Sequence, residues 1–160
     1  MAGDISLRLL EFLEWRGVDY EILAHPPTGD ALHTAEAAHV PGDRLAKAVI
    51  LKDAQGYVMA VLPATHHVDL EALRALLGRP LAFAREEELP ALFQDCAPGA
   101  IPPLGPAYGL EMVVDEALSD DPEIYFEAGD HRDLVRVDAA DFAALIEGAR
   151  RGRFSRHLGH

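Results

Sequence analysis

The 160-residue chain has only one cysteine, Cys96, and only two lysines, Lys47 and Lys52. A single cysteine excludes an internal disulfide bond and fits a reducing compartment. No apolar run approaches the roughly 18–20 residues that a membrane span needs. Charged residues such as Arg8 and Glu11 near the N-terminus are not typical of a secretory signal. We therefore expect a cytoplasmic protein that has no membrane partner.

Basic residues are scarce as well: 14 lysines and arginines face 27 acidic residues, for a formal net charge of −13. This balance argues against a broad nucleic-acid surface and against DNA as a partner. Any nucleic acid must be held locally, by a few cations. One basic cluster closes the chain, and we interpret it as a solvated tail that complements a helix end, with contact to a ligand or RNA left open. It consists of Arg150, Arg151, Arg153 and Arg156.

Several catalytic motifs are absent. There is no Gly-x-Gly-x-x-Gly or Walker loop for a nucleotide cofactor, and no Gly-x-Ser-x-Gly elbow for a serine hydrolase. The chain has eight histidines but neither a His-Glu-x-x-His pattern nor a cysteine pair. His66 and His67 would point to opposite faces of a strand, so we interpret them as the entry to a helix capped by Asp69. We expect no metal and no cofactor.

The length and a hydrophobic content of 49% predict one domain spanning residues 1–160, with a real core. Helical and strand patterns are mixed without strict βαβ alternation, which predicts an α+β fold with a mixed sheet. Helical patterns cover residues 4–16, a short stretch near 34–38, 69–77, a turn at 86–93, and a last helix from 138 or 141 to 146. Strand patterns cover residues 20–24, 45–52, 57–63, 81–84, 111–114, 123–126 and 134–137.

Lys47 lies in one of these strand patterns, on the same face as Leu45, Val49 and Leu51. An ammonium among leucine and valine side chains is costly unless it reaches an anion or a wet cleft. Extension of the side chain to the surface, or pairing with a carboxylate, would satisfy the ammonium equally well. The position alone leaves both interpretations open.

Residues 98–106 form a stiff loop with four prolines and two glycines. Proline fixes φ and removes an N–H donor, whereas glycine permits close backbone approach. The remaining amides are typical of sites that bind an anion or a developing oxyanion. The alternative is a surface turn between a helix and a strand. The amides belong to Gly99, Ala100, Ile101, Leu104 and Gly105.

A lysine strand followed some fifty residues later by Gly-x-x-x-Pro-x-Gly resembles the YbaK/prolyl-tRNA-synthetase-associated domain family. The resemblance extends from about Leu9 to Ile146. It implies a bent mixed sheet, a partly open barrel, that is flanked by helices and holds its site in a small pocket. The segments that carry it are 25–27, 34–38, 44–49, 99–105 and 125–132.

The resemblance also implies an activity: hydrolysis of the ester that links a wrong amino acid to tRNA. The protein would be free-standing, with the CCA end of mischarged tRNA as its partner and a synthetase as an open second partner. Lys47 would hold the phosphate and ribose of the acceptor end, while water or the substrate's own side chain attacks. The expected catalytic loop residues are Gly99, Ala100, Ile101 and Gly105, and the expected substrate-binding residues are His25, Thr34, Pro102, Pro103, Gly129 and His131.

Two departures from the family pattern stand out. Pro102 occupies a position where some members have a small hydroxylated residue, and Asp130-His131 replaces basic or small residues. His131 is open to two interpretations, a residue that polarises water or a structural residue of a turn. Two other functions also remain open. One is a non-catalytic module that binds a tRNA end or nucleotide; the other is a thiol hydrolase that uses Cys96 with His25 or His131 as base.

Overall fold

The computed structural model describes residues 5–26, 31–97, 99–118 and 122–158. This part of the chain confirms the α+β class. Its helices are α1 (Leu7–Arg16), α2 (Ala31–Ala37), α3 (Leu70–Leu77), α4 (Leu89–Leu92) and α5 (Ala139–Leu145). Its strands are β1 (Glu21–Ala24), β2 (Leu45–Asp53), β3 (Gly56–Pro63), β4 (His66–Val68), β5 (Ala82–Phe83), β6 (Glu111–Asp115), β7 (Glu123–Glu127), β8 (Asp133–Asp138), β9 (Arg150–Gly152) and β10 (Ser155–His157). Single 3-10 turns lie at Gly42–Arg44, Glu86–Glu88, Gly105–Tyr108 and Glu116–Leu118.

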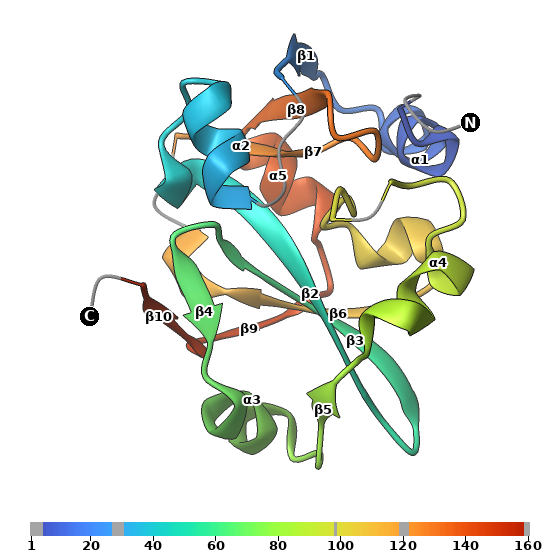
Figure 1. Cartoon of the computed structure of the whole chain (residues 1–160), viewed down its shortest axis with the longest axis vertical. Helices are drawn as coiled ribbons and strands as arrows, with labels where there is room; N and C mark the ends of the chain where they lie inside the picture. The colour runs from blue at the N-terminus through green and yellow to red at the C-terminus, as the bar shows by residue number, and fades with distance from the viewer. Residues whose placement is uncertain (1–4, 27–30, 98, 119–121, 159–160) are drawn as a thin grey trace.

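The main sheet is mixed, as the sequence predicted. Its order is β1-β8-β7-β2-β3-β6-β9, and β5 adds a short antiparallel pair to β2. The pairs β2–β7, β3–β6 and β6–β9 are parallel, and the other neighbours are antiparallel. The sheet is bent but does not close, so β1 and β9 remain its edges. Figure 1 shows the long strand β2 crossing the centre of the molecule, with α2 and α4 on either side of it.

Local sequence signals explain the best-defined elements. Asp69 caps α3, since its side chain accepts a hydrogen bond from the Ala72 amide at 3.1 Å. Gly78 ends the same helix with a φ of 63°. For α1, the cap is Ser6, whose side chain accepts from the Leu9 amide at 3.1 Å. The predicted start at residue 4 lies outside the described residues.

The core forms on both faces of the sheet. On one face, α1 and α5 contribute Leu13 and Phe142 to a large cluster that includes Phe126 of β7. On the other face, Leu73 of α3 packs with Leu62 of β3. A fully buried leucine side chain contributes roughly 1.5–3 kcal/mol. The sheet between these layers is therefore a rigid platform for β2 and β7. No helix in the described part of the chain is long and apolar enough to cross a membrane.

The C-terminal segment differs from the prediction. The four arginines are exposed, as predicted, but they do not form a tail behind a helix, because Arg150 and Arg151 lie in β9, which extends the main sheet beside β6. The following strand, β10, pairs with β4 in a separate two-stranded sheet. His66 and His67 belong to β4, which leads directly into the Asp69 cap of α3, so the predicted entry to this helix is a short strand. These short strands lack apolar alternation. They form because they pair with strands that are distant in sequence.

Candidate functional site

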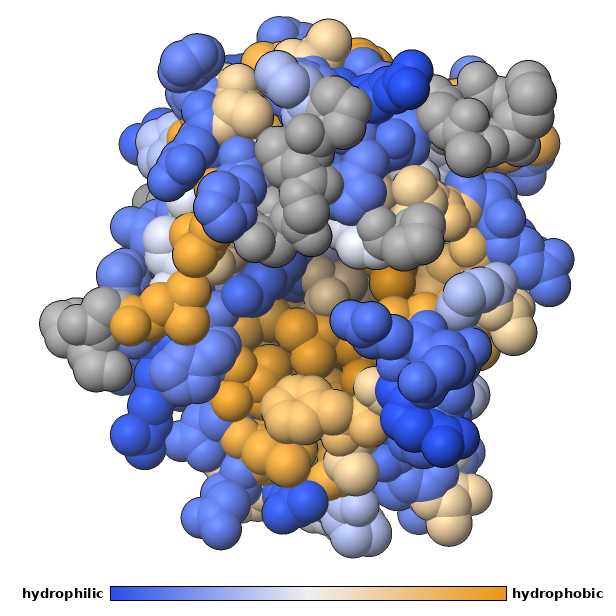
Figure 2. Space-filling view, in the orientation of Figure 1, coloured by the Kyte–Doolittle hydropathy of each residue, from blue (hydrophilic) through white to orange (hydrophobic). Residues whose placement is uncertain are grey.

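A cavity of about 790 Å³ lies beside the first half of β2. Its lining comes from β2, from the turn and helix at residues 86–92, from the loop at 96–101 and from Glu127. Figure 2 shows apolar side chains across the centre of this face and hydrophilic ones along both sides. A largely apolar cavity with a few polar groups is the usual form of a small-ligand site.

The structure brings Lys47 together with Gly99 and Ile101 around this cavity. Lys47 lies on β2 and is half-buried. Its Nζ donates a hydrogen bond to the Ala64 carbonyl at 3.4 Å. The two parts of the chain are some fifty residues apart, so their convergence is a property of the fold. A cation and a loop of backbone therefore line the same cavity.

Within the loop, only part of the predicted set reaches the cavity. Gly99 has a φ of 79°, which favours glycine, and it lines the cavity with Ile101. The Ala100 amide instead donates to the Ala97 carbonyl at 3.1 Å, so it is already engaged in a turn. Gly105 is buried on the far side, where a Cβ would lie 2.8 Å from the Leu110 carbonyl oxygen. A glycine is needed at this position because a larger residue would collide with the neighbouring backbone.

Pro102 and Pro103 are both buried, and neither is among the cavity-lining residues of the described chain. They join the lining loop to the 3-10 turn at Gly105–Tyr108. With φ fixed in both residues, this connection is stiff. The structure therefore places them as supports of the loop behind Ile101.

The other predicted binding residues gather around a carboxylate that the sequence analysis did not select. Glu127, at the end of β7, lines the cavity. His25 Nε2 lies 3.6 Å from its Oε1, and His131 Nδ1 lies 3.9 Å from the same atom. Thr34 and Gly129 are buried close by. Instead of lining the cavity themselves, these residues surround its carboxylate.

Five buried side-chain atoms in this cluster lack hydrogen-bond partners. In the described residues, buried side-chain nitrogen and oxygen atoms without a partner occur at this one place. Burial raises the pKa of Glu127 to about 7, with the Thr34 hydroxyl offsetting part of the shift. An acid with such a pKa changes its charge near neutrality, as acids at functional sites do. The atoms are His25 Nε2, both oxygens of Glu127, Asp130 Oδ2 and His131 Nδ1.

The turn between β7 and β8 holds this cluster in place. Asp130 Oδ1 accepts hydrogen bonds from the amides of Arg132 and Asp133, each at 2.9 Å. His131 has a φ of 61°, an unusual backbone state for a residue with a side chain. The neighbouring Asp130 carboxylate raises the pKa of Asp133 to about 6. The turn thus gathers acids and an imidazole beside Glu127.

Glu127 was hard to find from sequence. It lies within the 125–132 segment that carries the family resemblance, but a glutamate at a strand end is usually exposed. Its side chain is only 8% exposed here. The one available signal was position: Glu127 follows two aromatic residues of a buried strand, Tyr125 and Phe126.

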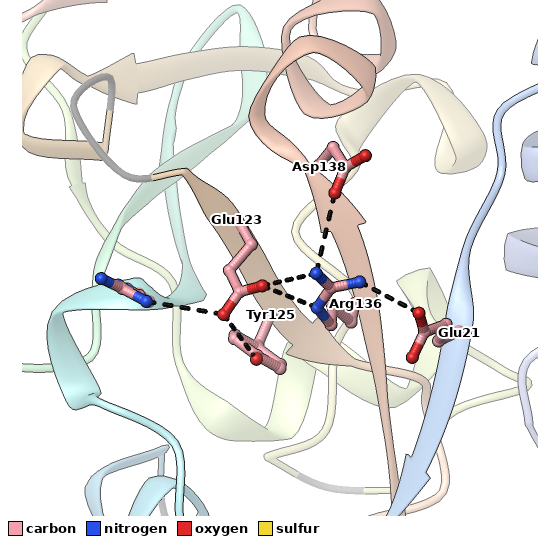
Figure 3. A network of polar contacts seen from close by, with 6 residues as sticks. Glu21, Glu123, Tyr125, Arg136 and Asp138 are labelled. Atoms are coloured by element: carbon pink, nitrogen blue, oxygen red, sulfur yellow. Dashed lines mark hydrogen bonds and ion pairs between the residues drawn. The ribbon is translucent and has the colours of Figure 1, made fainter.

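Glu123, four residues earlier on β7, has the opposite environment. Arg136 Nη2 lies 2.6 Å from Glu123 Oε2, and the Tyr125 hydroxyl donates to the other oxygen at 2.9 Å. These two interactions hold the pKa of Glu123 below its usual value. Figure 3 shows Arg136 between Glu123, Glu21 and Asp138. This network ties β1, β7 and β8 together.

The thiol hypothesis is not supported. Cys96 lines the cavity, but its Sγ lies 3.1 Å from the Tyr108 hydroxyl and 3.4 Å from Asp95 Oδ1. Burial raises the pKa of Cys96 to about 12. A thiol with this pKa stays protonated near neutrality, whereas the thiolate is the nucleophile. Cys96 therefore acts as a wall residue.

Histidines outside the cavity have partners of their own. His66 Nδ1 is 2.9 Å from the Ser155 hydroxyl, and the rings of His66 and His157 are 5.4 Å apart. Across residues 5–26, 31–97, 99–118 and 122–158, no three His, Cys, Asp or Glu side chains are grouped closely enough to hold a metal ion.

Comparisons with known proteins agree with this geometry. A family model described as an aminoacyl-tRNA editing domain matches residues 25–145. A multifunctional Ser/Thr-tRNA deacylase, ProXp-y, of Escherichia coli K12 is 29% identical over 146 residues, which cover 88% of this chain and 87% of the relative.

Solved structures give the same picture. The crystal structure of a candidate trans-editing enzyme for prolyl-tRNA synthetase has a TM-score of 0.81 at 27% identity, covering 93% of this chain and 95% of that one. A crystal structure of a protein of unassigned function has a TM-score of 0.82 at 23% identity, covering 93% and 99% of the two chains; it supports the fold alone.

Proposed function

Because the chain belongs to the family of aminoacyl-tRNA editing domains, we propose that it is a free-standing deacylase that hydrolyses the ester of mischarged tRNA. The observation that carries this proposal is the single cavity of about 790 Å³ shared by Lys47, the loop at Gly99 and Ile101, and Glu127. Such a cavity has room for an aminoacyl group and part of a terminal adenosine.

The reaction requires no nucleophile from the protein, because an aminoacyl ester is already activated. A water oxygen attacks the carbonyl carbon, and the bond from that carbon to the ribose oxygen breaks. The proton released by the water goes to the ribose oxygen. The products are the free amino acid and tRNA with a free terminal hydroxyl. Positioning and stabilisation of the oxyanion supply the rate.

We assign complementary roles to the two walls. Lys47 contacts the phosphate and ribose of the CCA end, for which its point charge is suited. The backbone at Gly99 and Ile101 lies where amides face the ester carbonyl. Removing one such donor from an oxyanion site typically costs about 100- to 1,000-fold in rate. Ala100 has no such role, because its amide is engaged within the loop.

The proposed partner is mischarged tRNA, entering by its CCA end, with association to a synthetase and a cytoplasmic location as further parts of the proposal. The identity of the amino acid removed is proposed from the comparison with a known relative. The name of the Escherichia coli relative adds serine and threonine as the first candidates.

The test is deacylation of a panel of mischarged tRNAs, beginning with Ser-tRNA, Thr-tRNA and Ala-tRNA. We expect Lys47→Ala to lower kcat/KM roughly 100-fold, the usual scale for loss of a charged contact to a ligand. Lys52→Ala is the matched control, because Lys52 lies on the same strand but pairs with Glu88. That control should stay within about threefold of wild type.

Full activity of Lys47→Ala would remove Lys47 from the proposed role. If wild type binds tRNA but leaves every ester intact, the chain is a non-catalytic module that binds a tRNA end, and the proposed function is wrong.

A further inference from the structure

The C-terminal basic segment, residues 150–158, has a composition unlike the rest of the chain. It contains four of the 14 basic residues and none of the 27 acidic residues. It also lies beyond residues 25–145, the part matched by the family model. The site described above makes no use of it. On a protein with a net charge of −13, such a segment is the natural place for a polyanion.

The fold puts this segment beside the cavity. The strand β10 pairs with β4, so that Arg156 lies opposite His67. The Leu158 amide then donates to the Thr65 carbonyl at 2.7 Å. The preceding carbonyl, that of Ala64, accepts the hydrogen bond from Lys47 Nζ. The end of the basic segment and the cation on the cavity wall therefore donate hydrogen bonds to adjacent residues of the turn between β3 and β4.

Electrostatics support the same proximity. Burial lowers the pKa of His66, the first residue of β4, and the charge of Lys47 acts in the same direction. The charge of Lys47 is thus felt at the strand with which the basic segment pairs. A phosphate held by Lys47 would have its neighbouring phosphates near β4 and β10.

The opposite side of the cavity has the opposite charge. Glu86 and Glu87 line the cavity next to α4, where a phosphate backbone would be repelled. Figure 1 shows β4 and β10 along one side of the molecule and α4 along the other, with β2 between them. Charge therefore favours one direction of approach for an RNA helix.

Two arginines of the segment are well exposed: the side chains of Arg153 and Arg156 are 88% and 71% accessible. Arg153 Nε lies 3.3 Å from Glu116 Oε2, and Arg156 Nε lies 3.1 Å from Asp69 Oδ2. Exposed ion pairs contribute little to stability. A phosphate can therefore engage these guanidinium groups at small cost.

We propose that the acceptor stem of tRNA docks on β10 and β4, with Arg153 and Arg156 contacting its phosphates while the CCA end passes Lys47 into the cavity. This inference rests on the proposed deacylase function for the cavity. The inference adds a surface, on β10 and β4, that binds the RNA helix. Through this one side, an acidic protein would be able to bind a polyanion. The contacts are to phosphates, so they do not depend on RNA sequence.

The experiment compares two double variants that change the net charge equally. Arg153→Gln with Arg156→Gln alters the proposed surface. Arg8→Gln with Arg85→Gln is the control, in which exposed arginines are removed from α1 and from the side near α4. Binding of uncharged tRNA is measured against salt concentration. Deacylation is measured with charged tRNA and with a short aminoacyl ester of adenosine, and thermal melts check the fold.

We expect the first double variant to bind tRNA roughly tenfold more weakly, with a log–log salt slope shallower by about 1.8, the value for two lost phosphate contacts. Its KM for charged tRNA rises while kcat is unchanged. Activity on the short ester stays at the wild-type level. The control pair should match wild type in all three measurements.

Equal losses in both double variants would mean that only overall charge matters, and would overturn the docking surface. An unchanged salt slope in the first double variant would overturn it as well. If wild type binds tRNA with the expected slope but hydrolyses no ester, the proposed function fails and the docking surface stands.

Discussion

Two carboxylates on the same face of β7 have opposite properties. Glu123 is held by Arg136 and Tyr125, and its pKa lies below the usual value. Glu127, four residues later, has two imidazoles at 3.6 and 3.9 Å but no guanidinium, and burial raises its pKa to about 7. One strand therefore carries a structural acid with a lowered pKa and an acid that titrates near neutrality.

The difference lies in what the neighbouring elements supply. At the start of β7, the neighbouring strands provide an arginine that stays ionised. At its end, next to the cavity, the nearest side chains are the imidazoles of His25 and His131, and burial of the Glu127 carboxyl raises its pKa. Pairs of acids with pKa values pushed apart by their surroundings mark functional sites. The contrast makes Glu127 the residue to test beside Lys47.

The largest expected effect is on catalysis by Glu127→Gln. We expect wild-type kcat/KM to vary with an apparent pKa near 7, because the Glu127 carboxyl changes its protonation there. The amide cannot titrate, so this pH dependence should disappear, and kcat should fall about 100-fold. The measurement is a pH profile of deacylation from pH 5.5 to 8.5.

The matched control is Glu123→Gln, which should keep the shape of the wild-type profile. An unaltered pH profile in Glu127→Gln would assign Glu127 a purely structural role. The functional difference between Glu123 and Glu127 would then be contradicted.

The next effect is on stability. Glu127 and Glu123 should change the free energy of unfolding with pH in opposite directions. Glu127 binds its proton more tightly in the folded state, so its contribution is present at low pH and is lost as pH rises from about 4.5 to about 7. The total change is on the order of 3 kcal/mol, from 1.36 kcal/mol for each unit of pKa shift. Glu127→Gln should therefore gain stability over wild type across this range.

Glu123 behaves in reverse. Its lowered pKa gives stability that is present above about pH 4.5 and is lost as pH falls. Urea unfolding of both variants from pH 3 to 8 checks the two trends. Parallel trends for Glu123→Gln and Glu127→Gln would contradict the assignment of opposite environments.

The smallest effect concerns Cys96, the other titratable group at this end of the cavity. With a pKa of about 12 it remains a thiol, so Cys96→Ser should change kcat/KM by less than about threefold. Iodoacetamide at pH 8 should label the wild-type protein slowly. A loss of activity beyond tenfold, with the fold intact by circular dichroism, would show that the thiol takes part in the reaction.

Sequence reasoning succeeded where the signals were local. Asp69 capped α3 as predicted because a capping side chain needs only the next three residues. The strands β2 and β3 followed from apolar runs separated by a turn. The meeting of Lys47 with Gly99 and Ile101 is long-range, and only the family resemblance linked them.

It failed where tertiary neighbours decide the outcome. The strand β10 contains Arg156 and His157, which have no strand pattern, and exists because β4 offers an edge. The Ala100 amide was predicted to be available, but the turn to Ala97 engages it. Glu127 became distinctive only through its burial, which no single sequence displays.

One contact behind the cavity, between Gly129 and Ser6, has a practical consequence. Gly129 has a φ of 100°, and a Cβ there would lie only 2.8 Å from the Cβ of Ser6. The Ser6 amide also donates to the Ala128 carbonyl at 2.8 Å. Ser6, the N-cap of α1, thus holds the β7–β8 hairpin that carries Glu127 in place. A fragment limited to residues 25–145 would lack Ser6. We expect Glu127 to be held less rigidly in such a fragment.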